Sequence, residues 1–576
     1  MSPFILLIVS ASFLWIMYHV YGTFIAKKIV KIDPQAPVPA HAQYDGKDYV
    51  PSSKQVMFGH HFTSIAGTGP IVGPAIGIIW GWIPACLWVL CGSVFMGAVH
   101  DFGALIISMR HQGRSLSDIA GDYMSPRVRF CFFIIVLLAL WIVIAIFGLI
   151  IALIFAKFPS SVLAVWLEIP LAIAFGFWIK RSNLPFWLKT LVSTILLYTC
   201  VYIGILVPIE LPSLFGLPAT GLWTLILLAY AFIASILPVS LLLQPRDYLN
   251  AWQLYVALAL IVGGIIVCSI LGELNFVAPA INTNPTGAPS MWPFLFITIA
   301  CGALSGFHSL ICSGTSAKQI NSEADAQYVG YGSMLMEAGL ALVVIIAVGA
   351  GLGLAYNSGS ETLFGTQAFQ AHYGSWQASA GLGSKLSAVV IGCSNMMARL
   401  NIPIEFGIAI VGVFIASFAG TTLDSATRVQ RYIVSECGVY LKKSWIQHKY
   451  AATAISVISA ALLAFSSGMN GKGALELWPL FGAVNQLLGG LALLVITVYL
   501  SKRAKYAIVV TGIPCLAVLA ITLWATIINQ RQFWLNDQWL LLIVNSIIIL
   551  LAITICIEGI TVLTQLLVKK KQKVMA

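Results

Sequence analysis

Histidine and carboxylate side chains lie inside or beside segments of the chain that are otherwise almost entirely apolar. They are His60, His61, His100, Asp101, His308 and Glu337. Ionisable groups are costly in a hydrocarbon environment, so their presence there indicates function. Because histidine titrates near neutral pH, His61, Asp101 and His308 could pass a proton between them. We predict a proton relay built from these three residues.

Two other roles fit the same side chains. Each could cap or brace interrupted backbone without titrating, because buried polar groups need hydrogen-bond partners. A metal site is less favoured, because no two of these residues have the i, i+4 spacing of a helical ligand pair. We therefore expect neither a metal nor a cofactor.

Hydroxyl side chains are concentrated in the segment TTLDSATRVQRY at 421–432. Thr421, Thr422 and Ser425 can lie along one helical surface. Hydroxyl and carbonyl oxygens are ligands that suit a small cation. We predict that these three residues bind a coupling cation.

Structural roles are the alternative for several polar residues. Helix-end capping would explain the hydroxyls, with Asp424 and Arg428 as an i, i+4 pair on the surface. Asn485 and Gln486 lie within another apolar run. For them, hydrogen bonds between helices are favoured over lining a pore.

Two apolar segments contain glycine, proline and small polar residues at a density unsuited to a continuous lipid-facing helix. They read TSIAGTGPIVGPAIGIIWGW (63–82) and TIACGALSGFHSLICSGTS (298–316). Proline removes a backbone donor and glycine loosens the helical turn, so both helices should break. Freed backbone groups are tolerated at membrane depth only where protein or a water-filled cavity satisfies them. The breaks therefore predict a binding site.

The predicted substrate-binding residues lie at these two breaks. They are Gly67, Thr68, Gly69, Ser305 and Gly306. The N terminus of a half-helix presents unpaired N–H groups and the positive end of a dipole, which favours an anionic substrate. The glycines spaced by four residues from 73 to 81 are assigned to helix packing.

No catalytic or nucleotide-binding signature is found in the sequence. GTGPIVG (67–73) lacks the spacing of a dinucleotide fingerprint, and GKG (471–473) lacks the flanking residues of a phosphate loop. Energy from ATP hydrolysis is therefore not expected. A gradient of protons or sodium ions should supply the energy for the protein's activity. We do not expect the protein to be an enzyme.

Membrane-spanning helices are the elements that must hold these residues in place. Of the 576 residues, 59% are hydrophobic and 9% are charged, whereas a soluble domain carries about 25% charged residues. We predict an all-α, polytopic bundle of about fifteen crossings, each long enough for the ~30 Å hydrocarbon core. The expected spans are 4–26, 63–82, 84–109, 130–156, 162–179, 188–208, 222–243, 252–272, 293–312, 333–356, 403–422, 450–467, 476–500, 506–528 and 538–567.

Lysine and arginine are distributed unevenly about these spans. All but five of the 31 fall on one face, and the five are Lys157, Lys385, Arg399, Lys472 and Arg531. The positive-inside rule then places the N terminus outside. It places the tail in the cytoplasm, with Lys569, Lys570, Lys571 and Lys573. The net charge of +11 is therefore a topology signal, and no nucleic-acid partner is expected.

The two interrupted segments are the second and ninth expected spans, so they cross the membrane in opposite directions. Such a pair is typical of transporters built from inverted repeats around a midplane site. We predict a single transmembrane domain, 1–576, with repeats at 58–208 and 293–500. The remaining parts are a peripheral helix at 1–30, an intervening hairpin at 222–272 and two peripheral helices at 506–567. The apolar piece 386–398 is too short to cross and should be re-entrant or interfacial.

The motifs described above resemble the carbon starvation protein A (CstA) family of bacterial inner-membrane transporters. The matching stretches are FGHHFTSIAGTGPIVGPAIG (58–77), CGALSGFHSLICSGTSAKQI (301–320), TTLDSATRVQRY (421–432) and WPLFGAVNQLLGG (478–490). The similarity extends from about residue 1 to beyond 500. The resemblance implies proton-coupled uptake of peptides or pyruvate during nutrient limitation. It also implies a fold related to the amino acid–polyamine–organocation superfamily, with LeuT-type inverted repeats.

The leading hypothesis is a symporter of the bacterial inner membrane that alternates access around the two broken helices. Pyruvate is the favoured substrate, because a small anion matches two positive helix ends. A peptide is the alternative, and a nutrient channel or sensor and a metal-dependent membrane enzyme are less favoured. The expected partners are the small-molecule substrate, a coupling proton or sodium ion, and the lipid bilayer.

Overall fold

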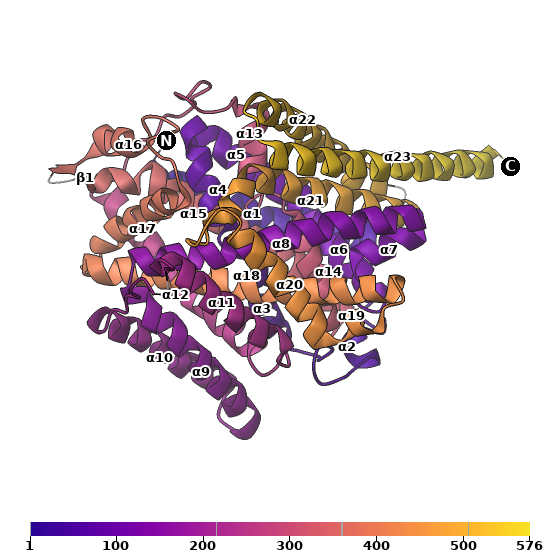
Figure 1. The fold of residues 1–576 in the computed structure, drawn as a ribbon, viewed down its shortest axis with the longest axis horizontal. Coiled ribbons are helices and arrows are strands. Elements are labelled where there is room, and N and C mark those ends of the chain that lie inside the picture. Colours follow the sequence, from indigo (N-terminus) through magenta and orange to yellow (C-terminus); the bar gives the residue numbers. More distant parts are fainter. Residues whose placement is uncertain (1, 215, 359–360, 505, 576) are drawn as a thin grey trace.

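The computed structural model describes residues 2–214, 216–358, 361–504 and 506–575. Regular structure in these residues is helical except for one short antiparallel hairpin, β1 (Tyr356–Ser358) and β2 (Glu361–Leu363), in which Tyr356 is paired with Leu363. Long helices run side by side through the molecule (Figure 1). The predicted all-α class is confirmed.

The helices of the first half are α1 (Pro3–Met17), α2 (Pro39–Ala42), α3 (Lys54–Ala66), α4 (Gly69–Gly77), α5 (Trp82–Gly92), α6 (Ala98–Arg110), α7 (Leu116–Tyr123), α8 (Pro126–Lys157), α9 (Ser160–Arg181), α10 (Phe186–Leu206), α11 (Ala219–Ile236) and α12 (Leu243–Ile270). Those of the second half are α13 (Met291–Thr298), α14 (Gly306–Gly314), α15 (Gly332–Gly349), α16 (Gly365–Tyr373), α17 (Leu382–Ala398), α18 (Ile404–Tyr440), α19 (Ser444–Gln447), α20 (Lys449–Ala464), α21 (Trp478–Ser501), α22 (Ile513–Leu535) and α23 (Trp539–Met575).

In the described part of the chain, twelve helical segments are long and apolar enough to cross a membrane, and the bent pair α3 and α4 brings the number to thirteen. Two further predicted spans take other forms. The segment at 293–312 is divided between α13 and α14, and the segment at 450–467 forms α20, an apolar helix of 16 residues. The protein is therefore a multi-pass membrane protein.

The first predicted break lies between α3 and α4, which are bent by 43° relative to each other. Gly67, between them, has φ 42° and ψ −136°, a conformation that residues with a side chain rarely adopt. Pro70 lies in the first turn of α4, where the missing N–H of proline costs nothing. Local sequence therefore both ends α3 and restarts the helix.

The second predicted break separates α13 from α14 by residues 299–305, which are not helical. The carbonyl oxygen of Ala300 accepts hydrogen bonds from the backbone N–H groups of Ala303, at 3.0 Å, and Leu304, at 2.6 Å. Ser305 is extended, with φ −123° and ψ 127°, and Gly306 begins α14. Both helix breaks that the sequence predicts are thus present.

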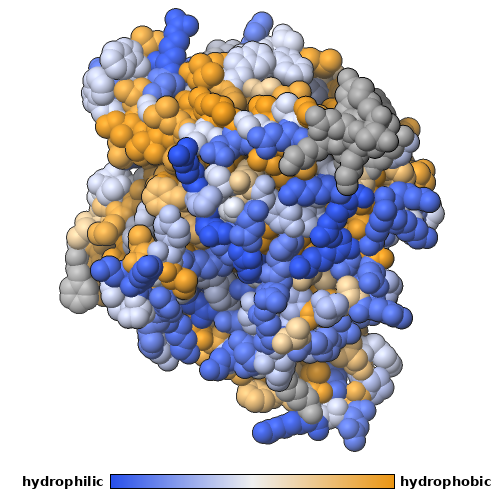
Figure 2. All heavy atoms as spheres, turned by 90° about the vertical axis from the view of Figure 1, so that its right-hand side faces the viewer, coloured by the Kyte–Doolittle hydropathy of each residue, from blue (hydrophilic) through white to orange (hydrophobic). Residues whose placement is uncertain are grey.

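The helices differ in how deeply they are buried. The apolar part of α21 is buried along its whole length, whereas that of α1 is mostly exposed. Figure 1 shows the C-terminal end of α23 extending away from the bundle, at the opposite end from the N terminus. Figure 2 views the end where α7 lies, and much of that surface is hydrophilic. The side chains of the tail lysines 569–573 lie outside the described residues.

The apolar stretch 386–398 forms most of α17. This helix is buried along most of its length and packs against α18, α15 and α12. It is therefore embedded in the bundle, beside the segment that contains α16 and the β-hairpin (Figure 1).

Candidate functional site

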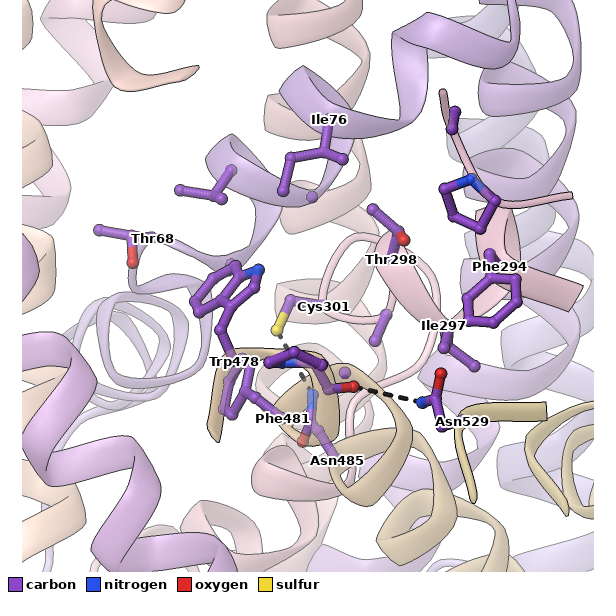
Figure 3. A pocket seen from close by; sticks show the side chains of 18 of the residues that line it. Thr68, Ile76, Phe294, Ile297, Thr298, Cys301, Trp478, Phe481, Asn485 and Asn529 are labelled. Atoms are coloured by element: carbon purple, nitrogen blue, oxygen red, sulfur yellow. Dashed lines mark hydrogen bonds between the residues drawn. The ribbon is translucent and has the colours of Figure 1, made fainter. Parts of the chain in front are cut away.

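A cavity of about 520 Å³ lies between the two helix breaks (Figure 3). Its walls come from α4, from the second break and from α8, α21 and α22. The lining side chains are mostly apolar or aromatic, with a few polar groups. Among the lining residues are Thr68, Gly69, Val72, Ile76, Phe147, Phe294, Thr298, Ala300, Cys301, Trp376, Trp478, Phe481, Asn485, Asn529 and Gln532. A concave, apolar site with few converging polar groups is typical of small-molecule binding.

The first break contributes backbone to this cavity. Thr68 and Gly69 line it, and the carbonyl oxygen of Thr68 accepts the first N–H groups of α4, from Ile71 and Val72. Gly67 lies on the other side of the chain, where an added Cβ would stand 2.5 Å from Thr422 Oγ1 and 2.8 Å from a ring carbon of Phe147. Of the three predicted residues, two therefore face the cavity and the third packs against α18 and α8.

The second break contributes Ala300 and Cys301 to the cavity. Ser305 and Gly306, the predicted residues, lie against α21 instead. The side-chain oxygen of Asn485 accepts hydrogen bonds from Ser305 Oγ at 3.1 Å and from the backbone N–H of Phe307 at 2.9 Å. Asn485 thus caps the N terminus of α14 and also lines the cavity, so it fills both of the roles considered for it.

The two breaks touch each other through the glycine face of α4. A Cβ added to Gly69 would lie 2.2 Å from Cys301 Sγ, and one added to Gly73 would lie 2.7 Å from the carbonyl oxygen of Thr298. A Cβ on Gly77 would meet Ile299 at 2.4 Å. The packing role predicted for Gly73 therefore extends to Gly69, whose missing side chain lets the second break approach.

Asp101 and His308 form a chain of close polar contacts with two further ionisable residues, His100 and Glu337. Asp101 contacts His100 Nδ1 at 2.7 Å through one oxygen and His308 Nδ1 at 2.9 Å through the other. His308 Nε2 lies 3.3 Å from a carboxyl oxygen of Glu337. All four side chains are fully buried. These contacts join α6, α14 and α15, and they lie directly after the second break.

His61 is separate from this chain. Its Nδ1 contacts Ser316 Oγ at 2.7 Å, and its Nε2 lies 3.8 Å from the sulfur of Cys312. Cys312 is one helical turn beyond His308 on α14. The structure thus brings together two of the three predicted relay residues and adds His100 and Glu337.

Two of the three predicted cation ligands face the first broken helix. Thr422 Oγ1 donates to the carbonyl oxygen of Ser64 at 3.2 Å, and the hydroxyls of Ser425 and Ser64 lie 2.9 Å apart. Thr421 faces α12, where its hydroxyl accepts a hydrogen bond from Asn250 at 3.2 Å. The hydroxyls therefore link α18 to α3 just before the break.

Residues 2–525 match the family described as carbon starvation protein CstA. The chain belongs to the CstA family. The "Peptide transporter CstA" of Bacillus subtilis (strain 168) is 35% identical over 554 residues, which cover 93% of this chain and 91% of that protein. The "Pyruvate/proton symporter BtsT" of Escherichia coli (strain K12) is 32% identical over 605 aligned positions. The alignment covers 92% of this chain and 82% of that protein.

The fold of this CstA-family chain is also found among solved structures. A manganese transporter from Eremococcus coleocola aligns with a TM-score of 0.51 and 14% identity, covering 91% of this chain and 99% of that one. The predicted LeuT-type class is confirmed. With relatives that are transporters, the CstA-family chain is a secondary transporter of a small organic molecule and not an enzyme.

Buried charges in this transporter correct one interpretation of the sequence. Asp424 and Arg428 are not a surface pair, because both are fully buried. Asp424 pairs with Arg246 of α12 and accepts a hydrogen bond from Tyr230 at 2.9 Å. The sequence places Arg246 in the loop between two predicted spans. In the structure α12 already begins at Leu243, so Arg246 belongs to its first turn and is buried in the bundle.

Glu168 is a buried carboxyl group that the sequence reasoning missed. One oxygen accepts a hydrogen bond from Ser417 at 2.6 Å, and the residue is 2% exposed. A carboxylate within the predicted span 162–179 was the signal that could have identified it. It lies on α9, away from the chain of Asp101 and His308.

On the side of this CstA-family protein where α7 lies, ion pairs hold the segment before α3 against α18. Asp48 contacts Arg428 at 2.7 Å and Arg431 at 3.1 Å. Burial raises the pKa of Asp48, but the guanidinium groups of Arg431 and Arg428 outweigh burial and hold that pKa below its usual range. The carboxylate is therefore ionised at neutral pH, and its two ion pairs connect the segment before α3 to α18.

Proposed function

We propose that this CstA-family transporter takes up a small carboxylate-bearing nutrient, with pyruvate as the first candidate, by proton-coupled symport. The observation that carries the proposal is the cavity walled by both helix breaks, which presents the backbone of Thr68 and Gly69 to a bound solute. The Escherichia coli relative is named as a pyruvate/proton symporter. Binding at the junction of two broken helices would let the solute control how the two halves move.

A peptide is the second candidate substrate. The Bacillus subtilis relative is named as a peptide transporter, and a cavity of about 520 Å³ has room for a solute larger than pyruvate. In either case the carboxylate would lie near Thr68 and Gly69, while Gly67 would hold the break against α18 and α8. Ser305 and Gly306 would support the site from behind by holding Asn485.

The coupling proton is assigned to the chain that Asp101 and His308 form with Glu337. A protonated His308 would be stabilised by carboxylates on both sides, and a protonated Glu337 would be neutral in an apolar setting. Because His308 follows the second break on α14, gain or loss of this proton would bias the position of that half-helix. His61 would connect this chain to the side on which α3 begins.

As the alternative to proton coupling, a sodium ion is assigned to Thr422 and Ser425, with Thr421 behind them. We expect Thr422→Val to raise the sodium concentration needed for half-maximal uptake about tenfold, because an oxygen ligand is lost. Sodium dependence of uptake in proteoliposomes measures this. Thr427→Val is the control, because its hydroxyl bonds to Leu423 within α18. The cation role would be excluded if uptake by the unaltered protein did not depend on sodium. It would also be excluded if Thr422→Val had the same sodium dependence as the unaltered protein.

The transporter is placed in the bacterial inner membrane, with its N terminus outside and its C terminus in the cytoplasm. The lysine and arginine bias supports this orientation. The cavity is bordered by the loop at 287–289 and by Trp376, from stretches assigned to the outside. With Asp48 and its arginines at the inner end, this conformation would be open outward and closed inward.

We expect Asp48→Asn to loosen the inner closure, because a hydrogen-bonded charge pair contributes about 2 kcal/mol. The readout is modification of native Cys312, which is buried on α14, by a thiol reagent added from the inner side. The rate of this modification should rise about thirtyfold. In the unaltered protein the closure should persist above the ordinary aspartate pKa of about 3.9 and weaken as the pH falls through the depressed pKa.

Asp122→Asn is the matched control for this change. Asp122 pairs with Arg114 and Arg129 on the same end of the molecule but is largely exposed. An equal effect of both variants, or no effect of Asp48→Asn, would remove the inner-closure role.

The internal repeats are assigned as the sequence suggests, with 58–208 and 293–500 related by inverted orientation in one transmembrane domain, 1–576. The hairpin 222–272, the helix within 1–30 and the two helices within 506–567 would then surround this moving unit. The placement of one broken helix at the start of each repeat supports this division.

Uptake into proteoliposomes tests the proposed function. Labelled pyruvate and a labelled dipeptide are offered while proton and sodium gradients are varied independently. Pyruvate accumulation that follows the pH gradient is expected. Accumulation of the dipeptide alone would transfer the assignment to peptides, and equilibration without accumulation would indicate a channel.

A further inference from the structure

Lys385, in the first turn of α17, is a buried lysine whose charge has no counterpart. The residue is 5% exposed, and within the described parts of the chain its ammonium group has no hydrogen-bond acceptor and no ion pair. Lys189, another buried lysine, instead donates to the carbonyl oxygens of Ile179 and Ser182. An ammonium group has three donors and strongly prefers to use them when it is removed from water.

Aromatic rings and a neutral histidine surround Lys385. Its nitrogen lies 4.9 Å from the ring centre of Tyr373 and 5.6 Å from that of Trp376. His372 contacts Tyr356 and Ser384, and burial together with Lys385 lowers the pKa of His372 to about 4, so it is uncharged at neutral pH. Burial lowers the pKa of Lys385 to about 7. The rings hold the ammonium by cation–π attraction and leave its N–H groups free.

Trp376 connects this ammonium to the substrate cavity. Its side chain lines the cavity, and its backbone N–H donates to the carbonyl oxygen of Thr286. Tyr373 is anchored by a 2.6 Å hydrogen bond to the carbonyl oxygen of Ala75 on α4. The turn between α16 and α17 is therefore fixed to the end of the first broken helix, with Lys385 directly behind the ring that faces the cavity.

The cavity itself offers no opposite charge to an anion. Among the described residues that line it, no side chain is charged. A carboxylate entering it would meet only backbone dipoles and neutral polar groups at the breaks. A carboxylate at Lys385 would instead form a charge-assisted hydrogen bond of the stronger kind. A shift of the Trp376 side chain, which lies in the turn at 374–380, would open that contact.

We propose that Lys385, framed by Tyr373 and Trp376, is a carboxylate-receiving site at the outer end of the cavity. The site captures the acid group of the solute before the solute reaches the helix breaks, and it selects anions over neutral analogues. This assignment rests on the proposed transport of a carboxylate-bearing nutrient. It adds to that proposal the Lys385 ammonium group as a ligand of the carboxylate, at a second binding position on the outer side of the helix breaks.

The test is equilibrium binding to purified protein, followed by uptake in proteoliposomes. Pyruvate is compared with pyruvamide, its neutral analogue, in the unaltered protein and in Lys385→Met, Lys385→Arg and Lys472→Met. The Kd for pyruvate should rise about tenfold in Lys385→Met, because a hydrogen bond to a charged group is lost. The Kd for pyruvamide should stay unchanged. Lys385→Arg should retain most of the affinity, and Lys472→Met, an exposed outer lysine, should behave as the unaltered protein.

Thermal unfolding separates binding from folding in this experiment. Methionine fits the apolar surroundings, so Lys385→Met should be at least as stable as the unaltered protein. Equal Kd values for pyruvate in the unaltered protein and Lys385→Met, or an equal loss for pyruvamide, would overturn the site. If the unaltered protein transports pyruvate while these Kd values are equal, only this inference falls. If it neither binds nor transports pyruvate, the proposed pyruvate substrate falls as well.

Discussion

Glu337→Gln is expected to abolish substrate accumulation driven by a pH gradient while leaving substrate exchange intact. Glutamine has nearly the shape of a protonated glutamate but cannot gain or release a proton. The Glu337 oxygens lack a well-aligned hydrogen bond within the described residues, and one lies 3.3 Å from His308 Nε2. A carboxyl group in that position can exchange its proton with the histidine. Without it, the solute would still bind, but no proton would accompany it.

Two measurements distinguish this outcome from simple damage. Counterflow of labelled against unlabelled substrate reports binding and the loaded transition, and it should stay near the level of the unaltered protein. Accumulation under an inward proton gradient should fall to the level of protein-free liposomes. Glu168→Gln, a change in another buried carboxyl group, should preserve both activities. Normal accumulation by Glu337→Gln would show that the proton is carried elsewhere.

Gly69→Leu is expected to eliminate both accumulation and counterflow. The physical reason is the contact between the two breaks, because even a Cβ at this position would lie 2.2 Å from Cys301 Sγ. A leucine side chain would have to push the second break away or fill the cavity beside it. Overpacking of this kind costs about 1–3 kcal/mol and displaces backbone. Thermal unfolding should therefore show a lowered Tm alongside the lost transport.

Matched variants locate the cause of that loss. Gly339→Leu is the control, because Gly339 lies in α15 with no neighbouring atom within 4 Å of an added Cβ. It should transport normally. Gly69→Ala should also be impaired, and adding Cys301→Gly should restore part of its activity by removing the opposing sulfur. Near-normal uptake by Gly69→Leu would mean that the breaks do not meet as described.

The two changes probe different parts of one mechanism. Glu337 lies at the end of a chain of ionisable groups that begins at His100 on α6, and Gly69 lies where the broken helices touch. His308 belongs to the same half-helix that follows the second break. A proton at His308 would act on α14, after the second break, and a solute at Gly69 would act on Cys301, within that break. Both would therefore act on the second break, which is the physical basis for coupling them.

The sequence by itself determined the membrane class, the family resemblance and the positions of both breaks. These features depend on local composition: apolar windows fix the spans, and glycine with proline interrupts a helix wherever it stands. Gly67 and Pro70 illustrate this, since each acts through its own backbone. The sequence also identified Asp101 and His308, because an ionisable group in an apolar span is conspicuous on its own.

Only the tertiary structure decided which of these groups meet. His308 lies between Asp101 and Glu337, whereas His61 contacts Ser316, and nothing in the spacing of these residues shows which pairs will form. Ser305 and Gly306 pack against Asn485, and Asp424 pairs with Arg246 instead of Arg428. Apart from the contact of His308 with Glu337, which lie 29 positions apart, each of these contacts joins residues more than 150 positions apart. They follow from the relative rotation and depth of packed helices, which a pattern along one helix does not contain.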